Sequence, residues 1–332
     1  MNKPVHFFDP VLEGLFTQRL TEHGAIAWEN NTTVLFYQLN QPGQEHILIP
    51  QAYGFIRHQL QQVQQTHAAD IIQHYNADAL SSLQATKIKP LAKQFCTQEN
   101  LHQWLEQTAA ILLTQPHWLQ HISPAASSQT ISSVQLTALY LQITQKDQQG
   151  IKLQHSYRAM LLATGIRIPS LHHQNFNQPP KLIPGILDFA TLQLALSRFP
   201  RVMFPEILGF TLAFCQMPTI IEACFPEYLI PSNFFQQRQY RLKRLIPSLL
   251  HCITSYLDLF PQQTQLLWQR IQQGSWLYQL QMQRCAEQFS ETLNLSTSVQ
   301  HSVAKILQQK AVAAIGHYQK IQLQPIRQML KN

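Results

Sequence analysis

Histidine is the most plentiful metal-binding side chain in this sequence, with 15 copies in 332 residues. His117 and His121 lie four residues apart in the segment PHWLQH. On a helix this spacing places both imidazoles on one face, where they could chelate a metal ion. Two ligands alone do not complete a metal site, and no carboxylate stands near them. We therefore interpret the pair as surface or packed histidines.

Five cysteines could act as nucleophiles, metal ligands or disulfide partners. They are Cys96, Cys215, Cys224, Cys252 and Cys285. An odd number without a C-x-x-C pair predicts neither a disulfide framework nor a zinc knuckle. The simplest interpretation is reduced thiols inside the cell. The first residues, MNKPVHFFDPVLEGLF, lack the uninterrupted apolar stretch of a signal peptide, so we predict a cytoplasmic protein.

The common local signatures of catalytic and phosphate-binding loops do not occur in this sequence. It has no G-x-G-x-x-G, G-x-x-x-x-G-K-[ST], H-E-x-x-H or G-x-S-x-G motif. Its net charge of +7 would attract polyanions only if the cations shared one surface. Arg238, Arg241 and Arg244 repeat at helical spacing, and we interpret them as a solvated or partly buried helix face. We do not expect nucleic-acid binding, because no aromatic platform accompanies them.

The elements that must position these side chains are predicted to be helices. Only 12% of the residues are charged, 45% are hydrophobic and ten are glycine. Abundant Gln, Leu and Ala with few glycines favours an all-α protein. The most apolar stretch, Ile207 to Phe214, falls short of the ~20 residues that cross a bilayer, so we predict no membrane span.

The clearest helix is expected after Thr97, which can cap its N-terminus. One apolar stripe follows, formed by Leu101, Trp104, Leu105, Ala109 and Leu112. Further helices are predicted over residues 132–145, 153–164, 186–199 and 205–216, on both sides of Pro261, and over about 298–330. Residues 172–185 should form an irregular connection. Residues 32–39 and 46–49 flank Asn40 to Gly43 and could form a short hairpin.

Three segments resemble the iron-containing redox enzyme family, whose members are haem-oxygenase-like helical proteins and include many non-haem di-iron oxidases and oxygenases. The segments are PHWLQHISPAASSQTISSVQLTALYLQ (116–142), QKDQQGIKLQHSYRAMLLATGI (145–166) and FPEILGFTLAF (204–214). The similarity covers about residues 95–290. It implies a haem-oxygenase-like helical bundle in residues 96–332, preceded by a mostly helical N-terminal extension in residues 1–95.

The resemblance also implies where iron ligands should stand. In the family, one helix brings Glu and His, a second brings Glu, and a third brings His, Asp and His. The matching positions here are Gln145, His155, Cys215, Arg238, Leu242 and Leu245. Only His155 keeps the expected ligand type. Amide, guanidinium and aliphatic side chains do not hold paired dications, so we predict that most of the di-iron centre is missing.

Two acidic or basic residues in these segments have alternative interpretations. His155 is either a ligand that faces the bundle interior in line with Ala159 and Leu162, or a neutral, hydrogen-bonded core histidine, which we favour. Glu206 cannot replace the acid missing at Cys215, because nine residues on a helix place the two on opposite faces. We expect Glu206 to meet a cation or to sit at a helix N-terminus.

The functional prediction is a divergent family member that has no cofactor and binds a small molecule or a partner. The alternative is an active iron-dependent oxidase or oxygenase with a rearranged ligand set, drawn from His155, Cys215 and Glu206 or Glu222. Haem binding through a histidine is a third possibility. The sequence names neither the ligand nor the oligomeric state.

Overall fold

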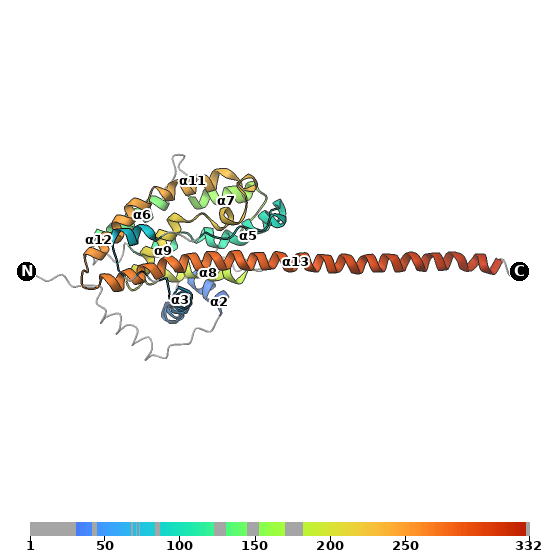
Figure 1. The fold of residues 1–332 in the computed structure, drawn as a ribbon, viewed down its shortest axis with the longest axis horizontal. Helices are drawn as coiled ribbons and strands as arrows, with labels where there is room; N and C mark the ends of the chain where they lie inside the picture. Colours follow the sequence, from blue (N-terminus) through green and yellow to red (C-terminus); the bar gives the residue numbers. More distant parts are fainter. Residues whose placement is uncertain are drawn as a thin grey trace, which may run out of the picture. The chain divides into compact units, whose positions relative to one another are not determined.

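A computed structural model describes residues 31–41, 45–67, 69–70, 72, 74–83, 87–122, 131–144, 153–169 and 182–329. All regular structure in this part of the chain is helical (Figure 1), which confirms the all-α prediction. None of the described helices combines the length and the apolar character that a bilayer crossing requires. The chain divides into two compact units, residues 1–286 and 287–332.

The first unit is built from short and medium-length helices, and its last helix continues into the second unit. The α-helices are α2 (Thr32–Leu39), α3 (Glu45–His67), α4 (Ala77–Ser82), α5 (Gln98–Leu113), α6 (Ile131–Thr144), α7 (Leu153–Ala163), α8 (Pro184–Leu196), α9 (Phe204–Gln216), α10 (Ile220–Cys224), α11 (Ser232–Lys243), α12 (Ile246–Asp258) and α13 (Thr264–Met329). Short 3-10 turns are η1 (Lys93–Phe95), η2 (His117–Leu119) and η5 (Glu227–Leu229). Four predicted helices, those over residues 132–145, 153–164, 186–199 and 205–216, are confirmed as α6, α7, α8 and α9.

Helix α5 forms as its sequence predicts. The Thr97 side chain accepts a hydrogen bond from the Asn100 amide at 3.2 Å, which caps the helix. All five residues of the predicted stripe are buried. They lie on the face that packs against α7, α8 and α10, so the stripe marks the core side of α5.

The hairpin predicted around Asn40 is wrong, because both of its arms are helical. Residues 32–39 form α2, and residues 46–49 belong to the first turns of α3. The Asn31 side chain accepts a hydrogen bond from the Val34 amide at 3.1 Å and caps α2. Burial of Leu35 and Phe36 against α8 then outweighs the strand propensity of the sequence.

The segments after residue 171 partly follow the prediction. Residues 172–181 of the predicted connection lie outside the described residues, whereas Pro184 and Gly185 already form the first turn of α8. Helix α12 ends before Pro261 and helix α13 begins after it, as predicted. The separate helix predicted from residue 298 is instead the later part of α13, which runs for 66 residues without interruption.

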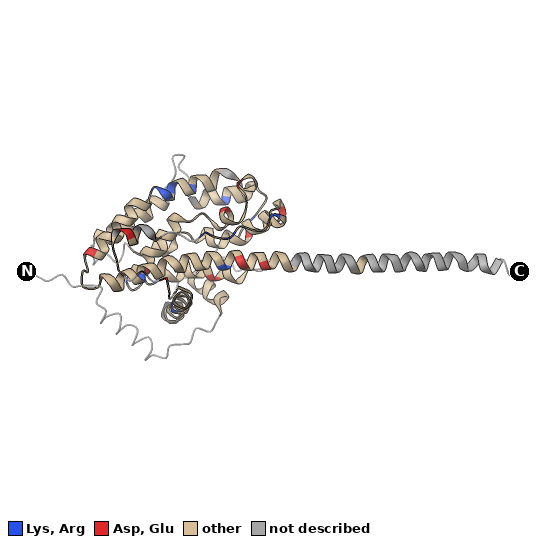
Figure 2. Ribbon diagram, in the orientation of Figure 1, with Lys and Arg blue, Asp and Glu red and all other residues tan. Residues whose placement is uncertain are grey.

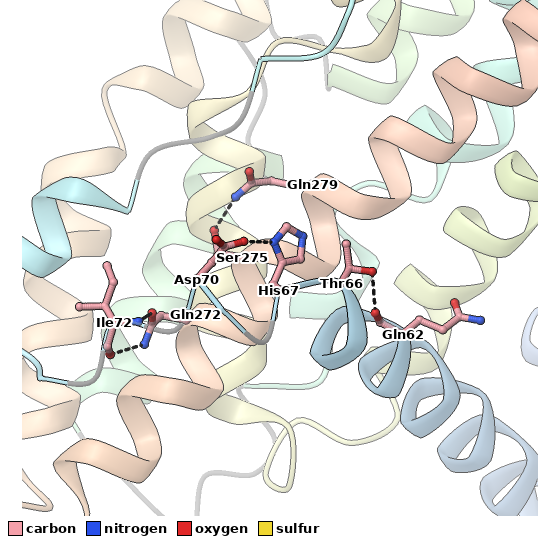
Figure 3. Close-up of polar contacts among 8 residues, drawn as sticks. All are labelled: Gln62, Thr66, His67, Asp70, Ile72, Gln272, Ser275 and Gln279. Atoms are coloured by element: carbon pink, nitrogen blue, oxygen red, sulfur yellow. Dashed lines mark hydrogen bonds and ion pairs between the residues drawn. The ribbon is translucent and has the colours of Figure 1, made fainter.

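The start of α13 holds the segment that follows α3 (Figure 3). The buried Gln272 side chain accepts a hydrogen bond from the Ile72 amide at 2.9 Å and donates one to the Ile72 carbonyl at 3.1 Å. His67 bonds Asp70 at 2.9 Å and stacks on Trp276 with ring centroids 5.2 Å apart. These contacts fix part of the N-terminal region to α13. The predicted division at residue 95 stays a prediction.

Helices α9 and α13 cross with their backbones in direct contact. A Cβ atom added to Gly209 of α9 would lie 1.8 Å from the Ile271 carbonyl oxygen of α13. A Cβ atom added to Gly274 of α13 would lie 2.0 Å from the Glu206 carbonyl oxygen of α9. Each helix therefore needs a glycine where the other approaches. Gly209, in the PEILG segment, is one of these two glycines.

Candidate functional site

The residue that keeps a family ligand type, His155, lies on the solvent side of α7. His155, Ala159 and Leu162 are all exposed. The opposite face carries Tyr157 and Leu161, which are buried. The prediction that His155 faces the interior is therefore wrong, both for the ligand and for the core-histidine interpretation. Apolar burial on α7 follows the spacing from Tyr157 to Leu161 instead.

The other positions implied for iron do not offer a suitable ligand set. Gln145 lies outside the described residues, and Leu242 and Leu245 are buried aliphatic side chains. Burial raises the pKa of Cys215 to about 12, and the positive charge of Arg238 offsets only part of this effect. The thiol is therefore protonated near neutral pH and is a poor metal ligand. These residues do not fit a pair of iron ions.

Nor do other metal-binding side chains gather in the described ranges. Within them, no group of three or more His, Cys, Asp or Glu residues is close enough to hold a metal ion. His117 and His121 do not share a continuous α-helix, since the 3-10 turn η2 ends at Leu119. The Nδ1 atom of His117 lies 2.9 Å from the Thr114 carbonyl oxygen. This contact agrees with a packed histidine.

The most unusual polar residue of the interior is Arg238, whose side chain is only 1% exposed. Its Nη2 atom donates a hydrogen bond to Gln115 Oε1 at 3.2 Å, and its guanidinium lies over the Phe214 ring, 4.9 Å from the centroid. Its Nε and Nη1 atoms have no hydrogen-bond partner. On the solvated or partly buried face predicted for the three arginines, Arg238 is instead fully buried, whereas Arg244, which lies against the Tyr240 ring, is exposed.

Helix α11 carries Arg238 inward because of the residues on either side of it. Phe234, Arg238 and Leu242 are spaced by four, share one helix face and are all buried. This face packs against α7 and α9 (Figure 1). The sequence contains a signal for this placement, since the arginine stands in the apolar stripe of its helix. Reading the three arginines as one basic face hides it.

Tyr278 of α13 lies close to Arg238 and is also fully buried. Burial raises the pKa of Tyr278 to about 12, and the nearby guanidinium partly offsets this shift. The hydroxyl of Tyr278 interacts with the Arg238 guanidinium, although the two do not form a hydrogen bond of normal geometry. The ring meets Phe189 and Phe210 edge-on, with centroids 5.2 and 5.0 Å away. Tyr278 is therefore held by aromatic packing, with its hydroxyl beside the guanidinium.

A buried amide of α8, Gln193, lies near Thr114. The Thr114 hydroxyl donates its hydrogen to the Ala110 carbonyl at 2.8 Å and lies 3.3 Å from Gln193 Oε1, and the next residue, Gln115, binds Arg238. Gln193 is fully buried, and its Nε2 atom has no partner. We call Gln115, Phe214, Arg238 and Tyr278 the Arg238 cluster. Its atoms without a hydrogen bond of normal geometry are Arg238 Nε and Nη1 and the Tyr278 hydroxyl. Each of them can donate a hydrogen bond.

Arg238 also has no counter-ion among the described residues, in contrast to the second inward-facing arginine of this region. Arg270 binds the Glu206 carboxylate twice, at 2.7 and 2.8 Å. No carboxylate of the described residues forms an ion pair with Arg238, and charged side chains are sparse on the described helices (Figure 2). Glu222, which acts electrostatically on Tyr278, is engaged by the Thr219 amide and hydroxyl. A buried guanidinium without an anion is unfavourable for folding.

Thiol reactivity tests the environment of Cys215. All five cysteines are free, and burial raises the pKa of each one. Only Cys96 is partly exposed. We expect a thiol-specific reagent at pH 8 to modify Cys96 alone in the folded protein, and all five after unfolding. The Cys96→Ser variant should lose the early reaction. A second rapidly modified thiol in that variant would contradict the buried, protonated state of the others.

Comparison with known proteins found no family model, no curated protein and no solved structure that the chain matches.

Proposed function

We propose that this chain is a divergent haem-oxygenase-like helical protein that lacks an intact di-iron centre and binds a small molecule with a negatively charged group at Arg238. One observation carries the proposal: Arg238 is 1% exposed and has no counter-ion among the described residues. Folding would favour an apolar residue at such a position. A ligand that supplies the missing anion explains why the protein keeps a guanidinium there.

The chemistry of the implied iron positions supports binding over iron-dependent oxidation. The rearranged ligand set would need His155, Cys215 and Glu206 or Glu222. Of these, His155 is exposed and the Cys215 thiol is protonated. Glu206 is bound by Arg270, and Glu222 caps α10. Each candidate already has another environment or another partner, so no observation favours the oxidase.

A thermal-shift comparison tests ligand binding at Arg238. We expect small anionic compounds to raise the Tm of the wild-type protein, because a ligand that binds only the folded state stabilises it. The Arg244→Met variant, which loses an exposed guanidinium, should respond in the same way. The Arg238→Met variant should not respond. Equal shifts in all three proteins, or no shift in the wild type with any compound, would contradict the proposal.

An anaerobic Fe(II) titration followed by elemental analysis tests the absence of the di-iron centre. We expect far fewer than two irons per chain to remain bound after desalting. Stable binding of about two irons per chain would refute this part of the proposal, independently of the thermal-shift result.

A further inference from the structure

We infer that the ligand is a monocarboxylate with an apolar body, whose carboxylate binds the free edge of the Arg238 guanidinium. This inference rests on the proposed function and names its ligand class. Three properties of the Arg238 cluster lead to it: the hydrogen-bond geometry of the guanidinium, the single positive charge, and the surrounding rings.

The guanidinium geometry favours a planar, two-oxygen acceptor. A guanidinium offers two edges that can each donate two parallel hydrogen bonds, one formed by Nε and Nη2 and the other by Nη1 and Nη2. Gln115 takes one hydrogen of Nη2, and the Nε and Nη1 atoms of Arg238 make no hydrogen bond of normal geometry, although the Tyr278 hydroxyl lies beside the guanidinium. Whichever hydrogen Gln115 takes, one complete edge remains. A carboxylate matches such an edge with both oxygens.

The charge of the cluster favours a monoanion. Arg238 is its only charged member, and Tyr278 remains neutral because burial raises its pKa to about 12. One carboxylate neutralises one guanidinium. A doubly charged phosphate would leave a negative charge in the interior, close to Glu222, which already acts electrostatically on Tyr278. The Tyr278 hydroxyl adds a neutral hydrogen-bonding group beside the guanidinium and no further positive charge.

The walls beside the guanidinium favour an apolar body on the ligand. Phe214 lies under Arg238, and Trp118 meets Phe214 edge-on with ring centroids 5.0 Å apart. Phe210 joins this group through Trp118 and Tyr278. A hydrocarbon or aryl group can pack against such rings, whereas a polyhydroxylated ligand would leave its hydroxyls unpaired. Because Arg238 is buried, the ligand must enter through a local opening of the helices.

Isothermal titration calorimetry with phenylacetate tests this inference. Three probes of related or contrasting chemistry accompany it: phenylacetamide, which is neutral, phenethylamine, which is cationic, and inorganic phosphate. We expect phenylacetate to bind the wild type and Arg244→Met at one site per chain, with a Kd below about 1 mM. Arg238→Met should weaken binding at least ~30-fold, the usual result of removing one partner from a buried charge pair.

Two further variants separate recognition from an effect on folding. Arg238→Lys keeps the positive charge but cannot donate two parallel hydrogen bonds to one carboxylate, so we expect about 10-fold weaker binding. Tyr278→Phe keeps the ring and loses one hydrogen-bond donor, so we expect binding weaker by roughly 3- to 10-fold. Near-UV circular dichroism of every variant should match the wild type. Equal binding of phenylacetate to wild type and Tyr278→Phe would exclude the tyrosine from the contact.

The outcomes distinguish this inference from the proposed function. Phosphate binding that depends on Arg238, without phenylacetate binding, would overturn the monocarboxylate and leave an anion site. Equal binding of phenylacetate and phenylacetamide would overturn recognition of the carboxylate. Failure of all four probes to bind the wild type would overturn the inference, and the wider thermal-shift series would then decide the proposed function separately.

Discussion

Substituting Gly209 by Ala is expected to lower the free energy of unfolding by about 3 kcal/mol or more. The added Cβ would lie 1.8 Å from the Ile271 carbonyl oxygen and 2.8 Å from the Ser275 amide nitrogen. Both neighbours are backbone atoms of α13, so no side chain can rotate to make room. Helices α9 and α13 must move apart, and the side chains packed beside the crossing lose contacts. Urea unfolding followed by circular dichroism measures the loss.

Gly165→Ala is the matched control for this substitution. Gly165 follows α7 with a φ of +84°, and a Cβ there would meet nothing within 4 Å. Replacing it by Ala should lower the free energy of unfolding by only about 1 kcal/mol, because a side chain is disfavoured in this left-handed backbone conformation. Gly274→Ala should behave like Gly209→Ala, because its Cβ would lie 2.0 Å from the Glu206 carbonyl oxygen. A loss at Gly209 no larger than that at Gly165 would refute the close crossing.

Substituting Glu206 by Leu is expected to destabilise the protein by roughly 3–5 kcal/mol. The Glu206 and Arg270 side chains are 5% and 14% exposed and share two short hydrogen bonds. Removing the carboxylate leaves the guanidinium without a counter-ion, and the Val202 carbonyl that it also binds is neutral. The measurement is again the free energy of unfolding in urea.

A second substitution shows whether the loss comes from the unpaired charge. Replacing both partners, Glu206→Leu with Arg270→Met, should recover most of the stability, because no buried charge then remains. Glu227→Leu is the exposed control, and its effect should stay within about 0.5 kcal/mol. If Glu206→Leu cost no more than Glu227→Leu, the pair would contribute little to the fold.

These two positions give the FPEILGFTLAF segment a structural role. Glu206 binds Arg270, Gly209 admits the backbone of α13, and Phe210 packs edge-on against both Phe189 and Tyr278. Each contact joins α9 to helices distant in sequence. The part of the chain with the strongest family resemblance therefore serves helix packing in this protein. None of these three contacts involves metal chemistry.

Local sequence determined the helical class and several helix ends. Thr97 and the stripe from Leu101 to Leu112 predicted α5 because a cap and a 3.6-residue period are properties of one helix. The expectation that Glu206 meets a cation or a helix N-terminus was also correct, since it lies in the first turn of α9 and binds Arg270. A buried acid requires a partner whatever the fold.

Tertiary contacts overrode local preference in other places. Residues 32–39 have strand-forming side chains, yet α2 forms because α8 covers Leu35 and Phe36. The sequence predicts a separate helix over about 298–330, whereas α13 continues from Thr264 through residues 287–297 to Met329.

The sequence by itself determined which residues share a helix face; only the tertiary structure decided which face is covered. His155 was expected inside and is exposed, whereas Arg238 was expected on a solvated or partly buried face and is fully buried. Helical period relates neighbours three or four residues apart, but burial depends on segments far away in sequence, such as Gln115, which lies 123 residues from its hydrogen-bond partner Arg238. The candidate site arises where those distant helices meet, and that meeting is not encoded in any single segment.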